Sequence, residues 1–311
     1  MPTPSSRRLA LITGASLAFL AGCSSSSDSG SDTSGSHQPA ASSQVAVVAS
    51  TNVYGDITEQ IGGDKVSVTS IISDPDQDPH SYEANTQNQL ALSKAKVVIE
   101  NGGGYDDFVD RMLKSSNSSA EVINAVKVSG KTAPKGGELN EHVWYDFPTV
   151  AKVTDSIAAA LGKADPGSAA TFTKNAEAFK AKLKPLEAKE AQIKKEHGGE
   201  GVAITEPVPL YMLDASGLVD KTPAAFSEAI EEGDDVSPKV LQATLALFSA
   251  KQVKALVYNA QTSGPQTEKS EAAAKAAGIP VVPVTETLPQ GKDYLGWMTD
   301  NVDALAGALD K

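Results

Sequence analysis

The fold is organised around the segment Ile72-Ser-Asp-Pro-Asp-Gln-Asp-Pro-His80-Ser-Tyr-Glu83. Apolar residues from Val66 to Ile72 predict a strand that leads into this segment, and a helix-forming run follows it. The two prolines stiffen the loop, because each fixes its own φ and restricts the residue before it. His80 is thus presented at the carboxyl end of a strand, where open α/β sheets bind ligands. We interpret His80 as the first ligand of a metal site.

The first 23 residues predict a secretory leader that is not part of the fold. Arg7 and Arg8 precede an apolar run, residues 9–20, that is too short for a stable membrane-spanning helix. The ending Leu20-Ala-Gly-Cys23 resembles a bacterial lipobox, whose cysteine is lipidated and becomes the new N-terminus. Cys23 is the only cysteine, so an intramolecular disulfide is excluded. We expect residues 1–23 to be a lipoprotein signal peptide; the alternative is a plain signal peptide with a chance cysteine.

Residues 24–43 consist mainly of Ser, Gly and Asp, without periodicity. Such a segment cannot bury enough apolar surface to offset its ordering entropy, so it predicts a disordered tether. His37 lies in this tether and is interpreted as a solvated residue.

The charge of the chain restricts its partners. The sequence has 27 Lys and Arg residues, two of them in the leader, and 39 Asp and Glu residues, which leaves a net charge of −14 after the leader. This acidity argues against nucleic-acid binding and against electrostatic adhesion to anionic lipid.

Strand and helix patterns alternate from Gln44 onward. The first half predicts strands over 45–50, 66–72 and 97–101 and helices over 52–61, 85–93 and 106–113. Such alternation predicts a parallel sheet with right-handed crossovers. A polar loop, residues 130–140, then leads into Glu141-His142-Val-Trp-Tyr-Asp146 and a helix over about 147–161. His142 could simply pack beside Trp144 and Tyr145, but paired with His80 it is interpreted as a second ligand.

A long helix is predicted to connect the two halves. Asp165 as an N-cap and Pro166 at the first helical position mark its start, and Gly198 follows its end. About 32 residues at 1.5 Å each give a helix of ~48 Å, in which Pro185 predicts a kink. We expect a rigid connection rather than a wide hinge. His197, in the last turn, is interpreted as a helix-end residue that suits the dipole and not as a ligand.

The second half repeats the pattern of the first. It predicts strands over 201–205, 253–258 and 279–284 and helices after Pro207 and over 237–250, 265–277 and 294–309. Glu206 and Glu286 follow two of these strands, as His80 does in the first half. The expected fold is α/β: two lobes of mainly parallel sheet flanked by helices, 44–163 and 200–311, joined by one spanning helix, 164–199.

The ordered motifs resemble the cluster A-I family of solute-binding lipoproteins that serve zinc and manganese ABC importers. The motifs are the lipobox, Asp78-Pro-His80-Ser-Tyr-Glu83, Asn140-Glu-His142-Val-Trp-Tyr-Asp146, the long helix, Thr205-Glu206-Pro207 and Val284-Thr-Glu286-Thr-Leu288-Pro289. They extend over essentially the whole mature chain. The resemblance implies two α/β lobes with a metal between them, and His80, His142, Glu206 and Glu286 as its ligands.

This sequence departs from the family pattern at two places. Glu286 stands where the family usually has Asp, and Pro207 and Pro209 replace part of the small and aromatic run after the third ligand. Asp214 and Asp146 are the next candidates for the fourth ligand. Asp146 and Glu83 are also interpreted as partners that orient the neighbouring histidines.

The implied ligands suit a divalent transition metal. Imidazole nitrogen with carboxylate oxygen fits Mn²⁺, Zn²⁺ and Fe²⁺, whereas Ca²⁺ and Mg²⁺ prefer oxygen alone. Two neutral histidines and two carboxylates neutralise such an ion, so it can be buried. Zinc members often carry a histidine-rich tract before the second histidine; residues 131–141 have none, which favours manganese, although Zn²⁺ binds more tightly in almost any such site.

We therefore expect a monomeric binding protein, not an enzyme and without a catalytic cofactor, held by the lipid on Cys23 to the extracytoplasmic face of the cell membrane. It would capture Mn²⁺ or Zn²⁺, with Fe²⁺ also suitable, and deliver it to an ABC permease and its ATPase. Two alternatives stay open: an exported metal-dependent hydrolase and a surface adhesin. The sequence contains neither a His-Glu-x-x-His nor a Gly-x-Ser-x-Gly motif, two frequent hydrolase signatures.

Overall fold

The computed structural model describes residues 44–74, 77, 82–83, 85–135 and 137–311. These residues belong to one compact unit and contain two parallel sheets of four strands. The first sheet consists of β1 (Val45–Thr51), β2 (Val66–Ile72), β3 (Val97–Glu100) and β4 (Glu121–Asn124). The second consists of β5 (Gly201–Ile204), β6 (Val219–Asp220), β7 (Leu256–Asn259) and β8 (Val281–Val284). The predicted α/β class with two parallel sheets is confirmed.

The two sheets have the same strand order, β2-β1-β3-β4 and β6-β5-β7-β8. In the first sheet Val47 pairs with Val68 on one side and Val97 on the other. Val47 and Val48 are both buried, but they belong to separate core clusters on opposite faces of the sheet. Because both faces are covered, β1 is a continuous apolar run rather than an alternating one.

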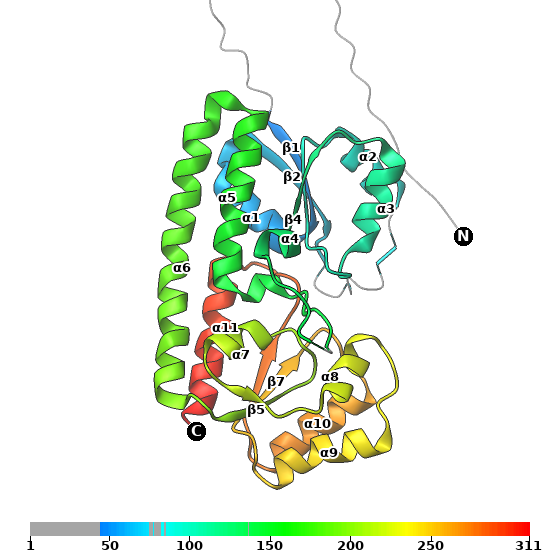
Figure 1. The fold of residues 1–311 in the computed structure, drawn as a ribbon, viewed down its shortest axis with the longest axis vertical. Helices are drawn as coiled ribbons and strands as arrows, with labels where there is room; N and C mark the ends of the chain where they lie inside the picture. Colours follow the sequence, from blue (N-terminus) through cyan, green and yellow to red (C-terminus); the bar gives the residue numbers. More distant parts are fainter. Residues whose placement is uncertain (1–43, 75–76, 78–81, 84, 136) are drawn as a thin grey trace, which may run out of the picture. The chain divides into compact units, whose positions relative to one another are not determined.

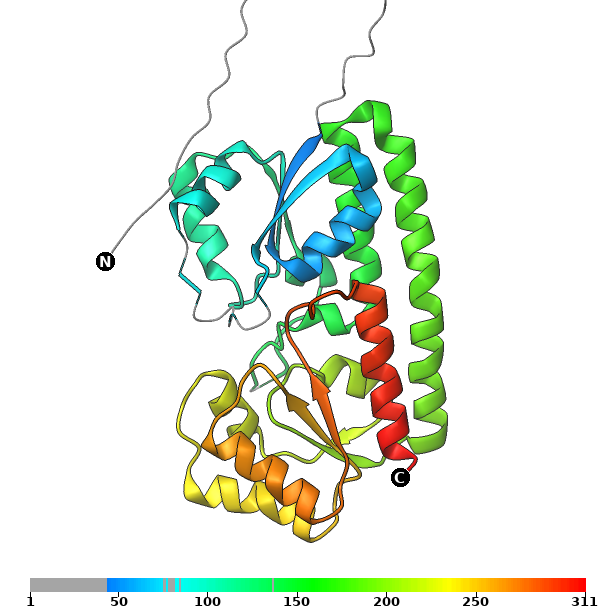
Figure 2. The same ribbon diagram turned by 180° about the vertical axis from the view of Figure 1, so that it is seen from behind.

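Helices cover both faces of the first sheet, as Figures 1 and 2 show, with α1 and α5 on one face and α2 and α3 on the other. The helices of this half are α1 (Asn52–Gly62), α2 (Thr86–Lys94), α3 (Asp107–Ser116), α4 (Ala125–Ser129) and α5 (Phe147–Ala164). The amino end of α5 is capped by Asp146, whose side chain accepts a hydrogen bond from the Thr149 amide at 3.0 Å.

The second sheet is covered in the same way. Phe248 and Ala274, from α9 and α10, pack with Ala203 and Leu256 on one face, while Leu305 of α11 belongs to the cluster on the other. The helices of this half are α7 (Leu210–Ala215), α8 (Ala224–Glu231), α9 (Pro238–Ser249), α10 (Pro265–Ala276) and α11 (Tyr294–Leu309).

Helix α6 (Ala169–His197) runs alongside both halves (Figure 1) and packs on α1, α5, α7 and α11. Its 29 residues give a length of about 44 Å. The predicted α-helix begins at Pro166, three residues before the observed start at Ala169. Asp165 does act as a cap, accepting from the Gly167 amide at 3.1 Å, but it begins a 3-10 turn, Pro166–Ser168, and the α-helix begins after that turn. His197 is the last residue of the helix. Its Nδ1 atom lies 3.4 Å from Glu200 Oε2, and its Nε2 atom lies 3.3 Å from Asp310 Oδ1.

Four short elements, β4, α4, β6 and α8, were not predicted. Each has eight residues or fewer, too short for a clear hydrophobic period. Two further 3-10 turns, Gly63–Lys65 and Val143–Tyr145, complete the described structure. Within the described part of the chain, no helix combines the length and the apolar character needed to cross a membrane.

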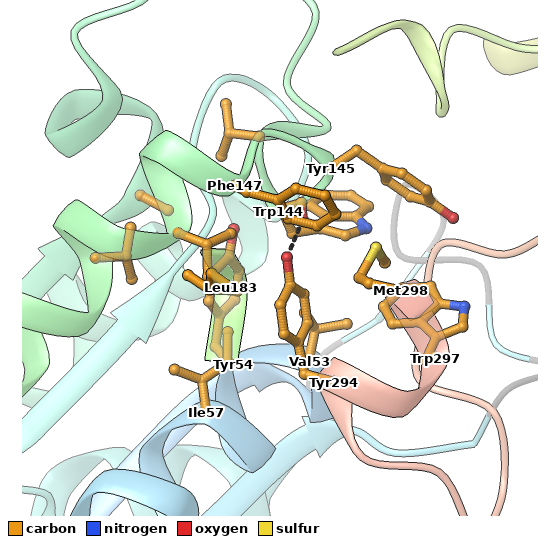
Figure 3. Close-up of a cluster of buried hydrophobic side chains, with 14 of the residues drawn as sticks. Val53, Tyr54, Ile57, Trp144, Tyr145, Phe147, Leu183, Tyr294, Trp297 and Met298 are labelled. Atoms are coloured by element: carbon orange, nitrogen blue, oxygen red, sulfur yellow. Dashed lines mark hydrogen bonds between the residues drawn. The ribbon is translucent and has the colours of Figure 1, made fainter. Parts of the chain in front are cut away.

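The largest core cluster includes side chains from both sheets. Figure 3 shows part of it, where Tyr294 of α11 points toward Trp144 and donates a hydrogen bond of 2.6 Å to the Trp144 carbonyl. The Tyr145 hydroxyl donates to the Thr285 carbonyl at 2.7 Å. The 3-10 turn Val143–Tyr145 is thus held against the segment after β8 and against the amino end of α11.

Candidate metal centre

His142 lies immediately before the 3-10 turn Val143–Tyr145 and is completely buried. Its Nδ1 atom is 2.8 Å from the Asn140 Oδ1 atom, and the Asn140 amide nitrogen donates to the Pro207 carbonyl at 3.1 Å. That second bond fixes which end of the amide faces the imidazole. Because an amide oxygen only accepts, the neutral ring carries its proton on Nδ1 and its lone pair on Nε2. The Nε2 atom is therefore the one that can bind a metal.

Glu206 and Glu286 occupy the turns after β5 and β8, and both are buried, with 3% and 4% of their surface exposed. A single amide joins them: Asn259, the last residue of β7, donates from Nδ2 to Glu206 Oε2 and to Glu286 Oε1, each at 2.8 Å. Two carboxylates from different strands are thus brought together at the carboxyl edge of the second sheet.

Tyr105 connects this carboxylate pair to His142. It lies close enough to Glu286 that burial, followed by the charge of Glu286, raises the pKa of Tyr105 well above its usual range. Its ring meets the His142 ring edge-on, with the centroids 5.9 Å apart. Tyr105 follows three glycines, 102–104, which all have positive φ, a conformation that favours glycine. One tyrosine from the first half therefore contacts ligand candidates of both halves.

Glu231, at the end of α8, is a further acid beside His142. Its Oε1 atom is 3.6 Å from His142 Nε2, and its side chain is 10% exposed. Burial, followed by the charges of Glu141, Glu206 and Glu286, raises the pKa of Glu231 to about 9. Glu141 is also perturbed: burial and nearby acids raise its pKa to about 7. Ligand atoms of Glu141, His142 and Glu231 lie within 4.8 Å of one another.

A cavity of about 640 Å³ adjoins this group. Its wall contains Gly103 and Asn140 from the first half and Pro207 and Leu210 from the second. Its acidic lining residues are Glu138, Glu141, Asp220, Glu228, Glu231 and Glu232, and among the described residues that line it none is basic. The cavity is therefore suited to a cation.

The sequence-predicted site residues have different outcomes. His142, Glu206 and Glu286 lie in the buried group described above, whereas His80 and Cys23 lie outside the described residues. Asp146, expected to orient His142, does not: one carboxylate oxygen caps α5 and the other pairs with Lys131 at 3.2 Å, while Asn140 contacts the imidazole. Asp146 does not reach His142 because the free backbone amides at the amino end of α5 need a hydrogen-bond acceptor, and its side chain supplies one.

The two other acids considered for the site are exposed. Asp214 lies in α7 with its side chain exposed, and burial raises its pKa while nearby Lys131 lowers it. Glu83 is also exposed. Glu231, whose Oε1 atom lies 3.6 Å from the His142 Nε2 atom, was not predicted.

Sequence reasoning missed Asn259, Tyr105 and Glu231. The first was within reach, because the strand-end rule that selects Glu206 and Glu286 also selects Asn259. Tyr105 follows a triple glycine after β3, which is a second available signal. Glu231 gave no such signal, because it lies at the end of a helix and reaches the site only through tertiary packing.

This arrangement is chemically suited to holding a divalent cation. A buried imidazole and several buried carboxylates share one region, and the described contacts between them contain no lysine or arginine. A cation would compensate the carboxylate charges and accept the imidazole lone pair.

Comparison with known proteins gives a consistent family. The family described as "Zinc-uptake complex component A periplasmic" matches residues 47–308. The manganese ABC transporter substrate-binding lipoprotein scaA of Streptococcus gordonii is 27% identical, over 95% of this chain and 96% of its own. The iron ABC transporter substrate-binding lipoprotein MtsA of Streptococcus pyogenes serotype M1 is 27% identical, over 98% and 99%.

The fold has solved counterparts. The periplasmic zinc-binding protein TroA of Treponema pallidum superposes with a TM-score of 0.72 at 20% identity, over 86% of this chain and 99% of that one. The fold, the extent of the family match and the relatives agree with the resemblance found in the sequence motifs. The chain therefore belongs to the family of periplasmic component A proteins of zinc-uptake complexes.

Proposed function

We propose that this protein is an extracytoplasmic substrate-binding protein that captures one divalent transition metal ion and delivers it to an ABC permease and its ATPase. The observation that carries the proposal is the buried convergence of His142 with carboxylates of the second half. Glu231 Oε1 lies 3.6 Å from the His142 Nε2 atom, and Tyr105 packs edge-on against His142 while the charge of Glu286 acts on it. Family membership supports a role in transport rather than catalysis.

The proposed ligands are His80, His142, Glu206 and Glu286. Three of them are buried near one another, and His80 is included because it precedes them in the family's ordered motif. The ion is Mn²⁺, Zn²⁺ or Fe²⁺. Relatives are named for manganese and iron and a fold neighbour for zinc, so the relatives support a transition metal as a class. Zn²⁺ should bind more tightly than Mn²⁺ in isolation, so the ion carried in the cell depends on metal supply as well as affinity.

We also propose that Cys23 carries a lipid that anchors the protein on the extracytoplasmic face, with residues 24–43 as the tether. The lipobox-like ending and the relatives named as lipoproteins support this. The proposed divisions of the mature chain are a lobe over 44–163, a connecting helix over 164–199 and a lobe over 200–311, acting as a monomer. The hydrolase and adhesin alternatives are not favoured, because the family match extends over 47–308.

Metal stoichiometry tests the binding function. The protein is made metal-free, loaded with Mn²⁺ or Zn²⁺ at neutral pH, desalted and analysed by inductively coupled plasma mass spectrometry. We expect one ion per chain, and loss of that ion in the His80→Ala/His142→Ala double variant. The matched control is His37→Ala/His197→Ala, which removes the other two histidines and should keep full stoichiometry. Unchanged metal content in the first double variant would contradict the ligand assignment.

Cell fractionation tests the anchor. Cys23→Ser removes the acceptor for the lipid, and a single missing anchor should release the protein or leave it uncleaved. Intact mass and membrane partitioning are compared with those of wild type and of Ser24→Ala, which leaves the cysteine in place. A Cys23→Ser protein with wild-type mass and membrane fraction would exclude this cysteine as the anchor.

A further inference from the structure

Glu231 differs from an ordinary surface glutamate, because its carboxylate is buried. Its side chain is 10% exposed at the end of α8, and its Oε1 atom has no hydrogen-bond partner among the described residues. Other acids of the same cavity wall, such as Glu228 and Glu232, are exposed to solvent. A buried, ionised carboxylate oxygen without a donor is unfavourable unless a proton or a metal cation neutralises it.

His142 does not supply that compensation by direct hydrogen bonding. The Asn140 contact keeps the imidazole proton on Nδ1, so the neutral ring turns a lone pair, not a donor, toward Glu231. The separation of 3.6 Å between Nε2 and Oε1 is also longer than a hydrogen bond. A divalent cation can bind both atoms at once, because each offers a lone pair.

The separation matches that of two ligands on one metal ion. Ligand atoms each about 2.1 Å from a metal and about 110–120° apart are separated by about 3.4–3.6 Å. The distance between His142 Nε2 and Glu231 Oε1 has this value. Glu206 and Glu286, the other carboxylates proposed for the site, are among the charges that act on Glu231.

We infer that Glu231 is a direct ligand of the metal ion, bound through Oε1 beside His142 Nε2. The inference rests on the proposed function and adds to it a carboxylate that neither the sequence motifs nor the family resemblance assigns. With Glu231, carboxylates outnumber imidazoles in the ligand set. Such a set suits Mn²⁺, which favours more oxygen ligands, better than Zn²⁺, which is satisfied by four.

Two substitutions separate charge from ligation. Glu231→Gln keeps the shape and one oxygen but removes the charge, and Glu231→Ala removes the donor atom altogether. Asp235→Asn and Asp235→Ala are the matched controls, because Asp235 is an exposed acid four residues further on that does not line the cavity. The dissociation constants for Mn²⁺ and Zn²⁺ are measured on the full mature chain by calorimetry with a competing chelator. Co²⁺ loading reports coordination through the visible absorption spectrum.

The inference predicts that Glu231→Ala weakens Mn²⁺ binding by about tenfold to a hundredfold, a loss typical for groups at a metal site, and weakens Zn²⁺ binding less. The Co²⁺ absorption of this variant should rise, because fewer ligands give a more intense spectrum. Glu231→Gln should lie between Glu231→Ala and wild type, and the Asp235 variants should match wild type.

Three results would overturn the inference. In the first, the Glu231 variants bind both ions as wild type does. In the second, they lose both ions equally and no more than the Asp235 variants do, which would indicate only a long-range charge effect. In the third, affinity falls but the Co²⁺ spectrum is unchanged. These results are distinct from a failure of the proposed function itself, in which wild-type protein would bind neither Mn²⁺ nor Zn²⁺.

Discussion

Asn52 and Leu288 are joined by two reciprocal hydrogen bonds although 236 residues separate them. The side-chain nitrogen Nδ2 of Asn52 donates to the backbone carbonyl of Leu288, and the backbone amide of Leu288 donates to Asn52 Oδ1, each at 2.9 Å. Asn52 begins α1, directly after β1, whereas Leu288 lies two residues beyond Glu286. The turn that carries Glu286 is therefore held by the first residue of a helix in the other half.

Asn52→Ala should remove both bonds and lower the free energy of unfolding by about 2 kcal/mol, at roughly 1 kcal/mol for each bond. It should also weaken metal binding, because the Glu286 turn loses its support. Asn175→Ala is the control: it removes one hydrogen bond of 2.9 Å to the Ile61 carbonyl, far along the chain from Glu286. Urea unfolding and metal titration of both variants check this. Equal metal affinities in the two variants would contradict the supporting role of Asn52.

Asn259→Ala should reduce both metal affinity and the stability of the metal-free protein. The change removes the donor shared by Glu206 and Glu286 and leaves two buried carboxylates facing each other. Removing a group that orients metal ligands typically lowers affinity tenfold to a hundredfold. Asn301→Ala is the control, since Asn301 is also a buried amide but donates to the Tyr145 hydroxyl at 3.2 Å. Wild-type metal affinity in Asn259→Ala would show that these carboxylates need no shared donor.

Metal affinity should rise with pH between about 5 and 9, with release of protons on binding. The pKa of Glu231 is raised to about 9 and that of Glu141 to about 7, so in the metal-free protein the first is protonated at neutral pH and the second partly so. A bound cation favours the ionised carboxylates and therefore displaces these protons. Calorimetry of Mn²⁺ binding in buffers of different ionisation enthalpy measures the release. A binding enthalpy that does not depend on the buffer would contradict it.

Glu190→Gln should stabilise the metal-free protein at pH 8 by on the order of 2 kcal/mol and have little effect at pH 4. Glu190 is 3% exposed in α6, and burial, followed by the charges of Asp146 and Glu187, raises its pKa to about 8. Between pH 4.5 and 8 the native state keeps a proton that the unfolded state has lost. Wild-type stability therefore falls as pH rises through that window, and the amide variant lacks this loss.

Urea unfolding at several pH values checks the Glu190 prediction. The control is Glu177→Gln, because Glu177 is an exposed acid on the same helix. A stabilisation of Glu190→Gln that is equal at pH 4 and pH 8 would show that the carboxyl group does not titrate in the stated range.

Strand ends were the most informative feature of the sequence. They selected Glu206 and Glu286, and a helix-preceding loop selected His142, because the site is built where parallel strands end. Asn259 obeys the same rule, but an amide is not a typical ligand of a transition metal, so its position alone did not indicate the site. The sequence pattern could not predict Glu231 as a site residue. Its helix follows a strand of only two residues, and its contact with His142 depends on how the two halves pack.

Local capping chemistry explains one wrong expectation, the role of Asp146, and one shifted boundary, the start of α6. Asp146 has the sequence context of a helix cap, with Pro148 at the second helical position, and in the structure that demand takes precedence over any contact with His142. Asp165 also acts as a cap, but the turn that it caps is the 3-10 turn Pro166–Ser168, and α6 begins only after that turn. His80 lies outside the described residues, so its role as a metal ligand stays a prediction.

Helix α6 packs on helices of both halves and so acts as a strut. Because α6 connects the two halves, metal binding does not have to fix their relative positions. The conformational entropy of that ordering was already lost when the chain folded. We therefore expect loading to be fast and the residence time to be set by the metal–ligand bonds. Thermal motion alone would then unload the carrier slowly. If the proposed importer distorts the site when it docks, release would be confined to that encounter, and delivery would be directional.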